Sequence, residues 1–419
     1  MITTPESGIL IKYFTKLKNK SFDHETSKNK KKTDFIFTQI FEDLKNIQQK
    51  ITYSSSKKEL YRFQIKKINN IRQIPKPRNF NQKGFPEDIR KHIEKTVIYQ
   101  IEYLFSLDGR NIKVHFILEE QDISQSIDYF SQSIEKMILW LSFIDKYSSK
   151  KCSKMLTIYI YMTSLLKTLP TSNIDIIDEN HANTAFTYTC IPVSEIVIFR
   201  KEEWFKVFLH ETFHNFGLDF SGMNNGYCKE HILSIFDVTS EVNLYEAYTE
   251  FWGEIMNCLL TSFFFTQNKN NLSGFLLTTY FLIDLERKFS FFQMVKVLDF
   301  MGLTYHDLYS LSKQSQLKRN TFYKENTSIL AYYVIKTILI NQYMDFIVWC
   351  DTCHFSLLDF KKTMNHQKEF CKYIEYHYKT KIMLERTHDM EEVVDHMNAK
   401  KKNADFLKNT MRMSLLEMV

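Results

Sequence analysis

The sequence predicts an α+β protein, in which a small mixed β-sheet and one chemically important helix are followed by a mostly helical C-terminal half. Segments with the two-residue alternation of β-strands occur between residues 110 and 200, whereas the periodicity after residue 201 is almost entirely helical. The chain has 9 Gly and 6 Pro beside 36 Phe and 23 Tyr, so it is poor in the tight turns that an all-β sandwich needs.

The expected elements follow in order along the chain. Residues 87–105 are expected to form a helix, and Asp108-Gly109 marks a turn into a strand at 110–118, where apolar and polar residues alternate. The elements expected next are a helix at 123–147, strands at 155–162, 184–189 and 195–200, and a helix from about 201 to 216. Helical periodicity recurs at 255–265, 288–300, 327–348 and 366–385.

A length of 419 residues allows two or three packed units, since domains usually contain ~100–200 residues. Polar stretches with little periodicity suggest where the chain divides. The predicted segments are a basic flexible arm at 1–32, a mainly helical N-terminal region at 33–107, a core that contains the sheet at 108–260, and a helical C-terminal domain at 261–419.

The formal net charge of +6 is unevenly distributed. Residues 1–100 contain 22 Lys and Arg against 10 Asp and Glu, which is +12, so the remaining residues carry −6. The run Lys28–Lys32 could contact nucleic acid or an acidic partner. We favour a solvated arm, because no aromatic or glycine pattern accompanies the lysines as base stacking would require.

The cysteines and apolar segments indicate the compartment. Seven cysteines are scattered and odd in number, so we expect no disulfide framework and a reducing environment. The N-terminus lacks a signal-peptide pattern, and the apolar windows 272–283 and 329–350 are too short or too polar to cross a bilayer. We therefore expect a protein that is neither secreted nor transmembrane, with no membrane partner.

The most informative segment contains the motif HExxH at residues 210–214. Positions four apart on a helix share a face, so His210 and His214 can each direct an imidazole nitrogen at one zinc ion. Glu211 lies ~100° further round the helix and can reach a water in the open coordination position as a general base. The flanking residues are uncharged, as expected for a buried metal helix. The alternative is two histidines packed in an ordinary helix.

A tetrahedral catalytic site needs a third protein ligand. In metzincin enzymes it lies three residues after a glycine, which here places Phe220, a non-ligand, after Gly217, with Asp219 one residue early. A second helix offers Glu246 and Glu250 four residues apart, so both can face the histidines. One could bind the metal while the other accepts a hydrogen bond from a ligand histidine. Glu254 extends this stripe, which could alternatively be a solvated acidic face.

The combination of HExxH and a separate helix with the pattern E-A-x-(S/T)-(D/E) resembles the gluzincin zinc peptidases, of which thermolysin is a member. The resemblance covers residues 195–254, although the 31 residues between the second histidine and Glu246 form a longer link than in thermolysin. It implies a zincin-like peptidase core at 108–260 that binds one Zn²⁺ through His210, His214 and Glu246. It also implies Glu211 as the base and Glu250 as the partner of a histidine.

Further roles are implied by the same resemblance. A peptide or protein substrate would add as a strand to the segment at 184–189 or 195–200. Peptidases of this type stabilise the oxyanion with a Tyr or His donor. Asn183 could bind substrate backbone or be a turn residue. The candidates for the oxyanion donor are Tyr227, His231, Tyr245 and Tyr248.

Several alternatives remain open. Cys350, Cys353 and His354, with His366 and Cys371 downstream, could form a structural zinc site, although reduced thiols are the favoured interpretation. The composition and the motif segment are similar to uncharacterised metallopeptidases of large DNA viruses, which would imply a location in the cytoplasm or the virion. The rival functions are a catalytically inactive zinc-binding structural or interaction protein, a nucleic-acid-associated protein acting through its basic N-terminal region, and a zinc hydrolase of non-peptide substrates.

Overall fold

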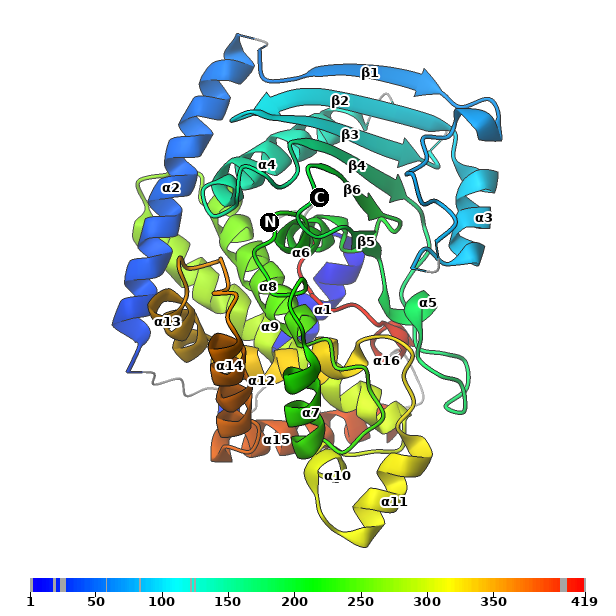
Figure 1. Cartoon of the computed structure of the whole chain (residues 1–419), viewed down its shortest axis with the longest axis vertical. Coiled ribbons are helices and arrows are strands. Elements are labelled where there is room, and N and C mark those ends of the chain that lie inside the picture. Colours follow the sequence, from blue (N-terminus) through cyan, green and yellow to red (C-terminus); the bar gives the residue numbers. More distant parts are fainter. Residues whose placement is uncertain are drawn as a thin grey trace.

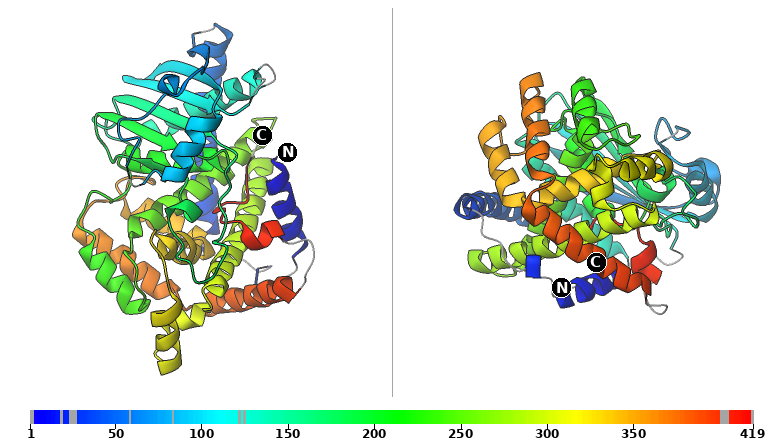
Figure 2. Two further views of the ribbon diagram at one scale, coloured as in Figure 1. Left: turned by 90° about the vertical axis from the view of Figure 1, so that its right-hand side faces the viewer. Right: turned by 90° about the horizontal axis from the view of Figure 1, so that it is seen from below.

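The computed structural model describes residues 3–17, 20–22, 28–57, 59–82, 84–120, 123, 126–399 and 405–417. As predicted, they form an α+β fold with a mixed sheet in the N-terminal half and a mostly helical C-terminal half (Figures 1 and 2). No helix among them is long and apolar enough to cross a membrane. The two chain ends lie close together, since the backbone N–H of Thr4 donates to the carbonyl of Glu417 over 3.1 Å.

The sheet has six strands in the order β1-β2-β3-β4-β6-β5. The pairs β3–β4 and β4–β6 are parallel, and the remaining neighbours are antiparallel. β2 and β3 form a tight hairpin through Asp108 and Gly109, which both adopt positive φ angles. The strand bounds are β1 Arg62–Lys67, β2 Tyr99–Leu107, β3 Arg110–Leu118, β4 Met155–Met162, β5 Ala185–Thr187 and β6 Val193–Ile198.

Both faces of the central strands are buried, and alternate residues of β3, β4 and β6 enter different cores. Val114 and Phe116 belong to a large core that includes residues of α4 and α6, whereas Ile117 and Tyr161 belong to a smaller core beneath α3. The helices are α4 (Ile127–Asp145) and α6 (Trp204–Asn215) on one face, with α2 (Lys30–Ser56) packed on α4, and α3 (Glu87–Thr96) on the other. This two-layer burial explains the alternation seen in the sequence.

The helical half is built around α8 (Leu244–Phe265) and α9 (Leu272–Phe300), which pack against each other (Figure 1). α8 also packs against α6, and α9 packs against α12 and α15. Most residues of α8 are buried. The other elements are α5 Glu179–Ala182, α7 Gly226–Ile235, α10 Tyr305–Tyr309, α11 Lys313–Phe322, the π-helix η3 Leu330–Ile335, α12 Lys336–Asn341, α13 Tyr343–Cys353, α14 Met364–His377, α15 Lys381–Ala399, α16 Asp405–Asn409 and the 3₁₀ turns η1 Lys20–Phe22 and η2 Ile71–Gln73.

The expected helix at 87–105 is wrong in its second half. α3 ends at Thr96 and β2 begins at Tyr99. Ile101 and Tyr103 alternate onto one sheet face, and pairing with both β1 and β3 overrides the local helical pattern. β1 was not expected. Phe63 and Ile65 alternate with polar residues, but the strand is short and all six of its residues are exposed at the sheet edge.

The N-terminal segment also differs from the expected flexible arm. Residues Pro5–Lys16 form helix α1, in which Leu10 and Phe14 are fully buried. The ring of Phe14 packs edge-on against Phe289 and Phe292 of α9. Part of the basic segment, at 18–19 and 23–27, lies outside the described residues. The domain boundaries near 32, 107 and 260 stay a prediction.

One disulfide joins Cys152 and Cys190, so the expectation of unpaired cysteines is wrong for this pair. The two residues lie 38 positions apart, and the segments before β4 and between β5 and β6 bring their Cα atoms to 4.4 Å. No spacing pattern in the sequence signals such a contact. The other five cysteines are free thiols.

Candidate metal centre

The helix that carries HExxH is enclosed by the fold. α6 follows β6 directly, and all but one of its twelve residues are buried. α8 crosses it at Gly253, where a Cβ would lie 3.4 Å from the Cβ of His210. The small residue therefore permits the close approach that brings the acidic stripe of α8 to the histidines.

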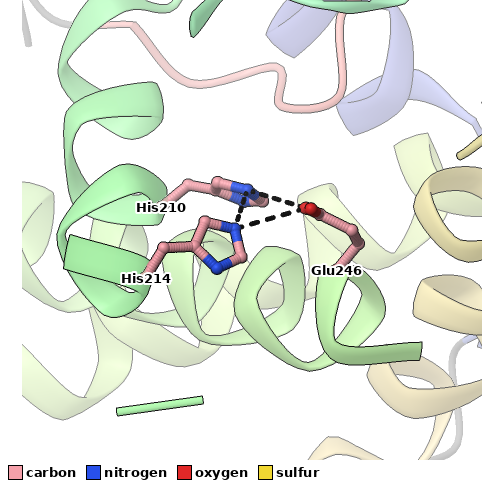
Figure 3. A group of neighbouring side chains, drawn as sticks. All are labelled: His210, His214 and Glu246. Atoms are coloured by element: carbon pink, nitrogen blue, oxygen red, sulfur yellow. Dashed lines mark hydrogen bonds and ion pairs between the residues drawn. The ribbon is translucent and has the colours of Figure 1, made fainter. Parts of the chain in front are cut away.

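Three side chains from these two helices converge (Figure 3). The Nε2 atoms of His210 and His214 lie 3.1 Å apart, and the Oε2 atom of Glu246 lies 3.2 Å and 3.3 Å from them. Ligands ~2.0–2.1 Å from a tetrahedral zinc ion would be about 3.3 Å from one another. The group therefore has the spacing that a metal ion requires, and it is the one His/Cys/Asp/Glu cluster of this kind found among the described residues.

The outward nitrogens of both imidazoles face carboxylates. Nδ1 of His210 lies 2.9 Å from Oε2 of Glu250, and Nδ1 of His214 contacts Oδ2 of Asp219. With Nδ1 donating in each case, both Nε2 atoms present lone pairs toward Glu246. Three acceptors facing one another in a buried site repel unless a cation lies between them.

The titration behaviour agrees with a site that requires positive charge. Burial alone would lower the pKa of both histidines, but Glu246 and Glu250 raise that of His210, and Glu246 and Asp219 raise that of His214 well above 6.5. Burial would raise the pKa of Glu246, yet the two imidazoles hold it far below its usual range. Without a metal, protons on the imidazoles would supply the charge that a divalent ion supplies when bound.

Asp219 is held in place by the turn that ends α6. Gly217 adopts a positive φ of 67°, and the backbone N–H of Ser221 donates to Oδ1 of Asp219 over 2.8 Å. Phe220 packs its ring against Phe360 with centroids 4.3 Å apart. The metzincin arrangement is therefore wrong here, and Asp219 contacts His214 instead of joining the triad.

Glu211 lies beside the triad in a small cavity. The cavity has a volume of about 40 Å³, and its walls come from α6, α8, η3 and the segment that leads into the edge strand β5. Glu211 is 7% exposed, and burial raises the pKa of its carboxyl. The residues around it include His210, Glu250, Tyr332, Thr184 and Ala185.

Tyr332 was missed by the sequence analysis. It lies on the π-helix η3, its hydroxyl donates to Oε2 of Glu246 over 3.1 Å, and its ring centroid lies 6.2 Å from that of His210. It follows Glu246 by 86 residues, so no local spacing connects the two. π-helical turns are rare and frequent at functional sites, but the sequence carries no signal for this one.

The four residues predicted as oxyanion donors lie in different surroundings. The ring of Tyr245 packs edge-on against His214 with centroids 6.0 Å apart. Tyr248 is fully buried and donates to the carbonyl of Leu358 over 2.9 Å, away from the triad. Tyr227 and His231 stack on each other on α7, and His231 lies 3.1 Å from Glu375. No described contact of Tyr227 or His231 reaches the triad.

Asn183 lies at the entrance to the site. It lines the cavity beside Glu211, and its Oδ1 accepts from the hydroxyl of Thr327 over 2.9 Å. It also lines an open groove of about 670 Å³, together with Glu246 and Tyr332. The groove lies between the segment of α5 and the start of α8, and the two hollows share Asn183 and Tyr332.

The cysteines and histidines between residues 350 and 371 do not form a metal-binding group among the described residues. The ring of His366 stacks on Trp349 with centroids 4.9 Å apart, and burial lowers the pKa of His354 to about 3. Cys350, Cys353 and Cys371 are free thiols, as favoured.

Comparison of the chain with known protein families, characterised proteins and solved structures found no match. The chemistry of the site is therefore inferred from its geometry. That geometry is a buried His/His/Glu group that is compatible with an HExxH-plus-Glu metal centre.

Proposed function

We propose that the chain is a zinc-dependent metallopeptidase. The observation that supports this is the convergence of His210, His214 and Glu246 within 4.8 Å of one another, next to Glu211, which lines a cavity that shares Asn183 and Tyr332 with a larger groove. The donor set of two imidazoles and one carboxylate is that of the catalytic zinc sites in thermolysin-like enzymes. The coarser conclusion, a candidate metal site, does not depend on the substrate.

A zinc ion in this site would polarise the scissile carbonyl and lower the pKa of the attacking water. The remaining work falls to side chains of the chain. Glu211 takes the proton from the water and delivers it to the leaving amine, a role suited to a carboxyl whose pKa is raised by burial. The hydroxyl of Tyr332 donates a hydrogen bond to the developing oxyanion. In this proposal it replaces the four donors considered from the sequence.

The substrate would enter as an extended strand. β5 is an edge strand of the sheet, and Thr184 and Ala185 at its start line the cavity beside Glu211. An unpaired strand edge offers backbone groups for β-addition of a peptide. The groove beside Asn183, Glu246 and Tyr332 has room for side chains on one side of the scissile bond.

Metal analysis and peptide cleavage test the proposal together. Wild-type protein should contain one zinc ion per chain, and His210→Ala or Glu246→Ala should lose it. Glu211→Gln should retain zinc but lower kcat/KM on a peptide library ~10²–10⁴-fold, the usual contribution of a general base. Wild-type protein that binds no zinc would overturn the proposal.

A catalytically inactive zinc protein is the second candidate. The cavity of about 40 Å³ beside the triad favours it, because this space holds a water but no substrate side chain. In that case the wild-type protein would contain zinc, cleave no peptide, and show no measurable change with Glu211→Gln.

A further inference from the structure

A buried lysine lies one helical turn before the first histidine of the motif. Lys206 on α6 forms an ion pair with Oε1 of Glu250, and both side chains are 2% exposed. The other oxygen of the same carboxylate, Oε2, faces Nδ1 of His210 at 2.9 Å. The three groups therefore form a chain that runs from the ammonium through the carboxylate to the imidazole.

We propose that Lys206 is a positioning residue of the metal centre. By holding Oε1 of Glu250 it turns Oε2 toward His210, and so fixes the direction in which Nε2 of His210 presents its lone pair. This inference rests on the proposed zinc site, but it concerns a residue that neither the HExxH motif nor the acidic stripe includes.

The charge balance explains why a cation is needed there. The site contains four carboxylates, that of Glu246 in the triad and those of Asp219, Glu211 and Glu250 beside it. A divalent ion offsets two of these charges. Within the part of the chain that the structure describes, Lys206 is the one Lys or Arg in ion-pair contact with any of the four. An uncompensated buried carboxylate costs several kcal/mol, so the ammonium is a required partner.

A second buried cation, Lys336, lies near Glu250. Lys336 pairs with Glu254 at 2.7 Å, one turn further along α8, and also acts electrostatically on Glu250. Without the ammonium of Lys206, Oε1 would have no partner in its present orientation, and Lys336 would be the nearest cation left to attract it. The carboxylate would then reorient away from His210, which would lose the acceptor of its Nδ1 proton.

The Lys336–Glu254 pair provides a matched control. Lys206 and Lys336 are both buried, and each pairs with a glutamate of α8. The two glutamates, Glu250 and Glu254, are four residues apart. Glu254, however, accepts from Ser290 rather than from a histidine of the triad. Lys206→Met and Lys336→Met therefore remove the same charge from similar surroundings, and only the first removes the ion-pair partner of the carboxylate that contacts His210.

The test measures the zinc dissociation constant by competition with a chromophoric chelator. Lys206→Met should weaken zinc binding ~10–100-fold, the usual effect of removing an outer partner of a metal ligand. Lys336→Met, although destabilising, should stay within about threefold of wild type. Lys206→Arg keeps the cation and should also stay within about threefold, whereas a purely steric role would be disturbed by the larger side chain.

A double-mutant cycle separates action through Glu250 from a general structural role. In the Glu250→Gln background, Lys206→Met should have almost no further effect on zinc affinity. An undiminished effect there, or zinc binding by Lys206→Met that is as tight as wild type or tighter, would overturn the inference. Should Lys206→Met fail to fold, Lys206→Arg and Lys206→Gln give the same comparison of charge kept with charge lost. Failure of the wild-type protein to bind zinc would instead overturn the proposed function.

Discussion

Replacing Asp219 with asparagine should damage the metal centre more than removing the side chain does. Oδ1 of Asp219 accepts from the backbone N–H of Ser221 over 2.8 Å, while Oδ2 faces Nδ1 of His214. A backbone donor cannot reverse its role. In Asp219→Asn the amide oxygen must therefore face Ser221, which places the NH₂ group against His214.

This orientation changes the tautomer of the histidine. An NH₂ group facing Nδ1 requires that nitrogen to accept, so the ring proton moves to Nε2, the atom that should bind the metal. Asp219→Ala leaves Nδ1 free to keep its proton. We expect Asp219→Asn to weaken zinc binding ~100-fold, which corresponds to about 2.7 kcal/mol, and Asp219→Ala to weaken it ~10-fold, within the range known for such partners.

The assay is chelator competition on folded protein, with Asp145→Asn as the control. Asp145 is also a buried acid in an ion pair, with Nε of Arg110 at 2.7 Å, but it lies on α4 and has no contact with the triad among the described residues. Its variant should lose stability and keep its zinc affinity. Zinc binding by Asp219→Asn within about threefold of wild type would refute the reasoning. So would an alanine variant that binds zinc more weakly than the asparagine variant.

Four other outcomes are expected. Tyr332→Phe should lower kcat ~10²–10³-fold with little change in KM, the effect of losing one oxyanion donor, and an unchanged kcat in steady-state assays would exclude that role. Burial lowers the pKa of His115 to about 4, so the unfolded chain binds the extra proton first as the pH falls below 6.5. Stability should therefore drop by about 3 kcal/mol more between pH 6.5 and 4 in wild type than in His115→Gln, as measured by urea unfolding at each pH. Trp140 is fully buried and donates from Nε1 to Thr212 of α6 over 2.8 Å, so Trp140→Ala should cost about 3–5 kcal/mol of unfolding free energy in the same assay, and a loss below about 1 kcal/mol would contradict this packing. Chelation of zinc should lower the unfolding temperature of wild type but not of His210→Ala, because free zinc at about 100 times its dissociation constant stabilises the native state by about 2.7 kcal/mol.

The sequence predicted well the parts of the fold that have a local pattern. β3 and β4 have the expected bounds, because their residues alternate between two buried faces. The alternation in β1 is weaker, since only Phe63 and Ile65 are apolar and all six residues are exposed at the sheet edge. α1 was not expected, although Leu10 and Phe14 lie four residues apart and form its buried face. Their burial depends on α9, nearly 280 residues away.

The candidate site, like the fold, was predicted where its residues have a local spacing pattern. The spacing of four residues within each helix predicted which side chains share a face, and the structure brings His210, His214 and Glu246 together. Contacts with segments distant in sequence carried no such signal. Tyr332 reaches Glu246 from a π-helical turn. Lys206 gains its ion-pair partner only when α8 packs against α6.

The acidic stripe of α8 shows what residue spacing can predict and what it cannot. Glu246, Glu250 and Glu254 have one residue type and one period, and a solvated acidic face was an open alternative. The structure buries the stripe and gives each carboxylate a different partner: the two Nε2 atoms for Glu246, Lys206 and Nδ1 of His210 for Glu250, and Lys336 for Glu254. Burial would raise the pKa of Glu250, but Lys206, His210 and Lys336 hold it far below its usual range. Burial, together with the carboxylate of Glu286, raises the pKa of Glu254 to about 8. Identical side chains on one helix face thus acquire different chemistry from the elements packed against them, and Lys206, one turn before His210, is the cation that pairs with Glu250.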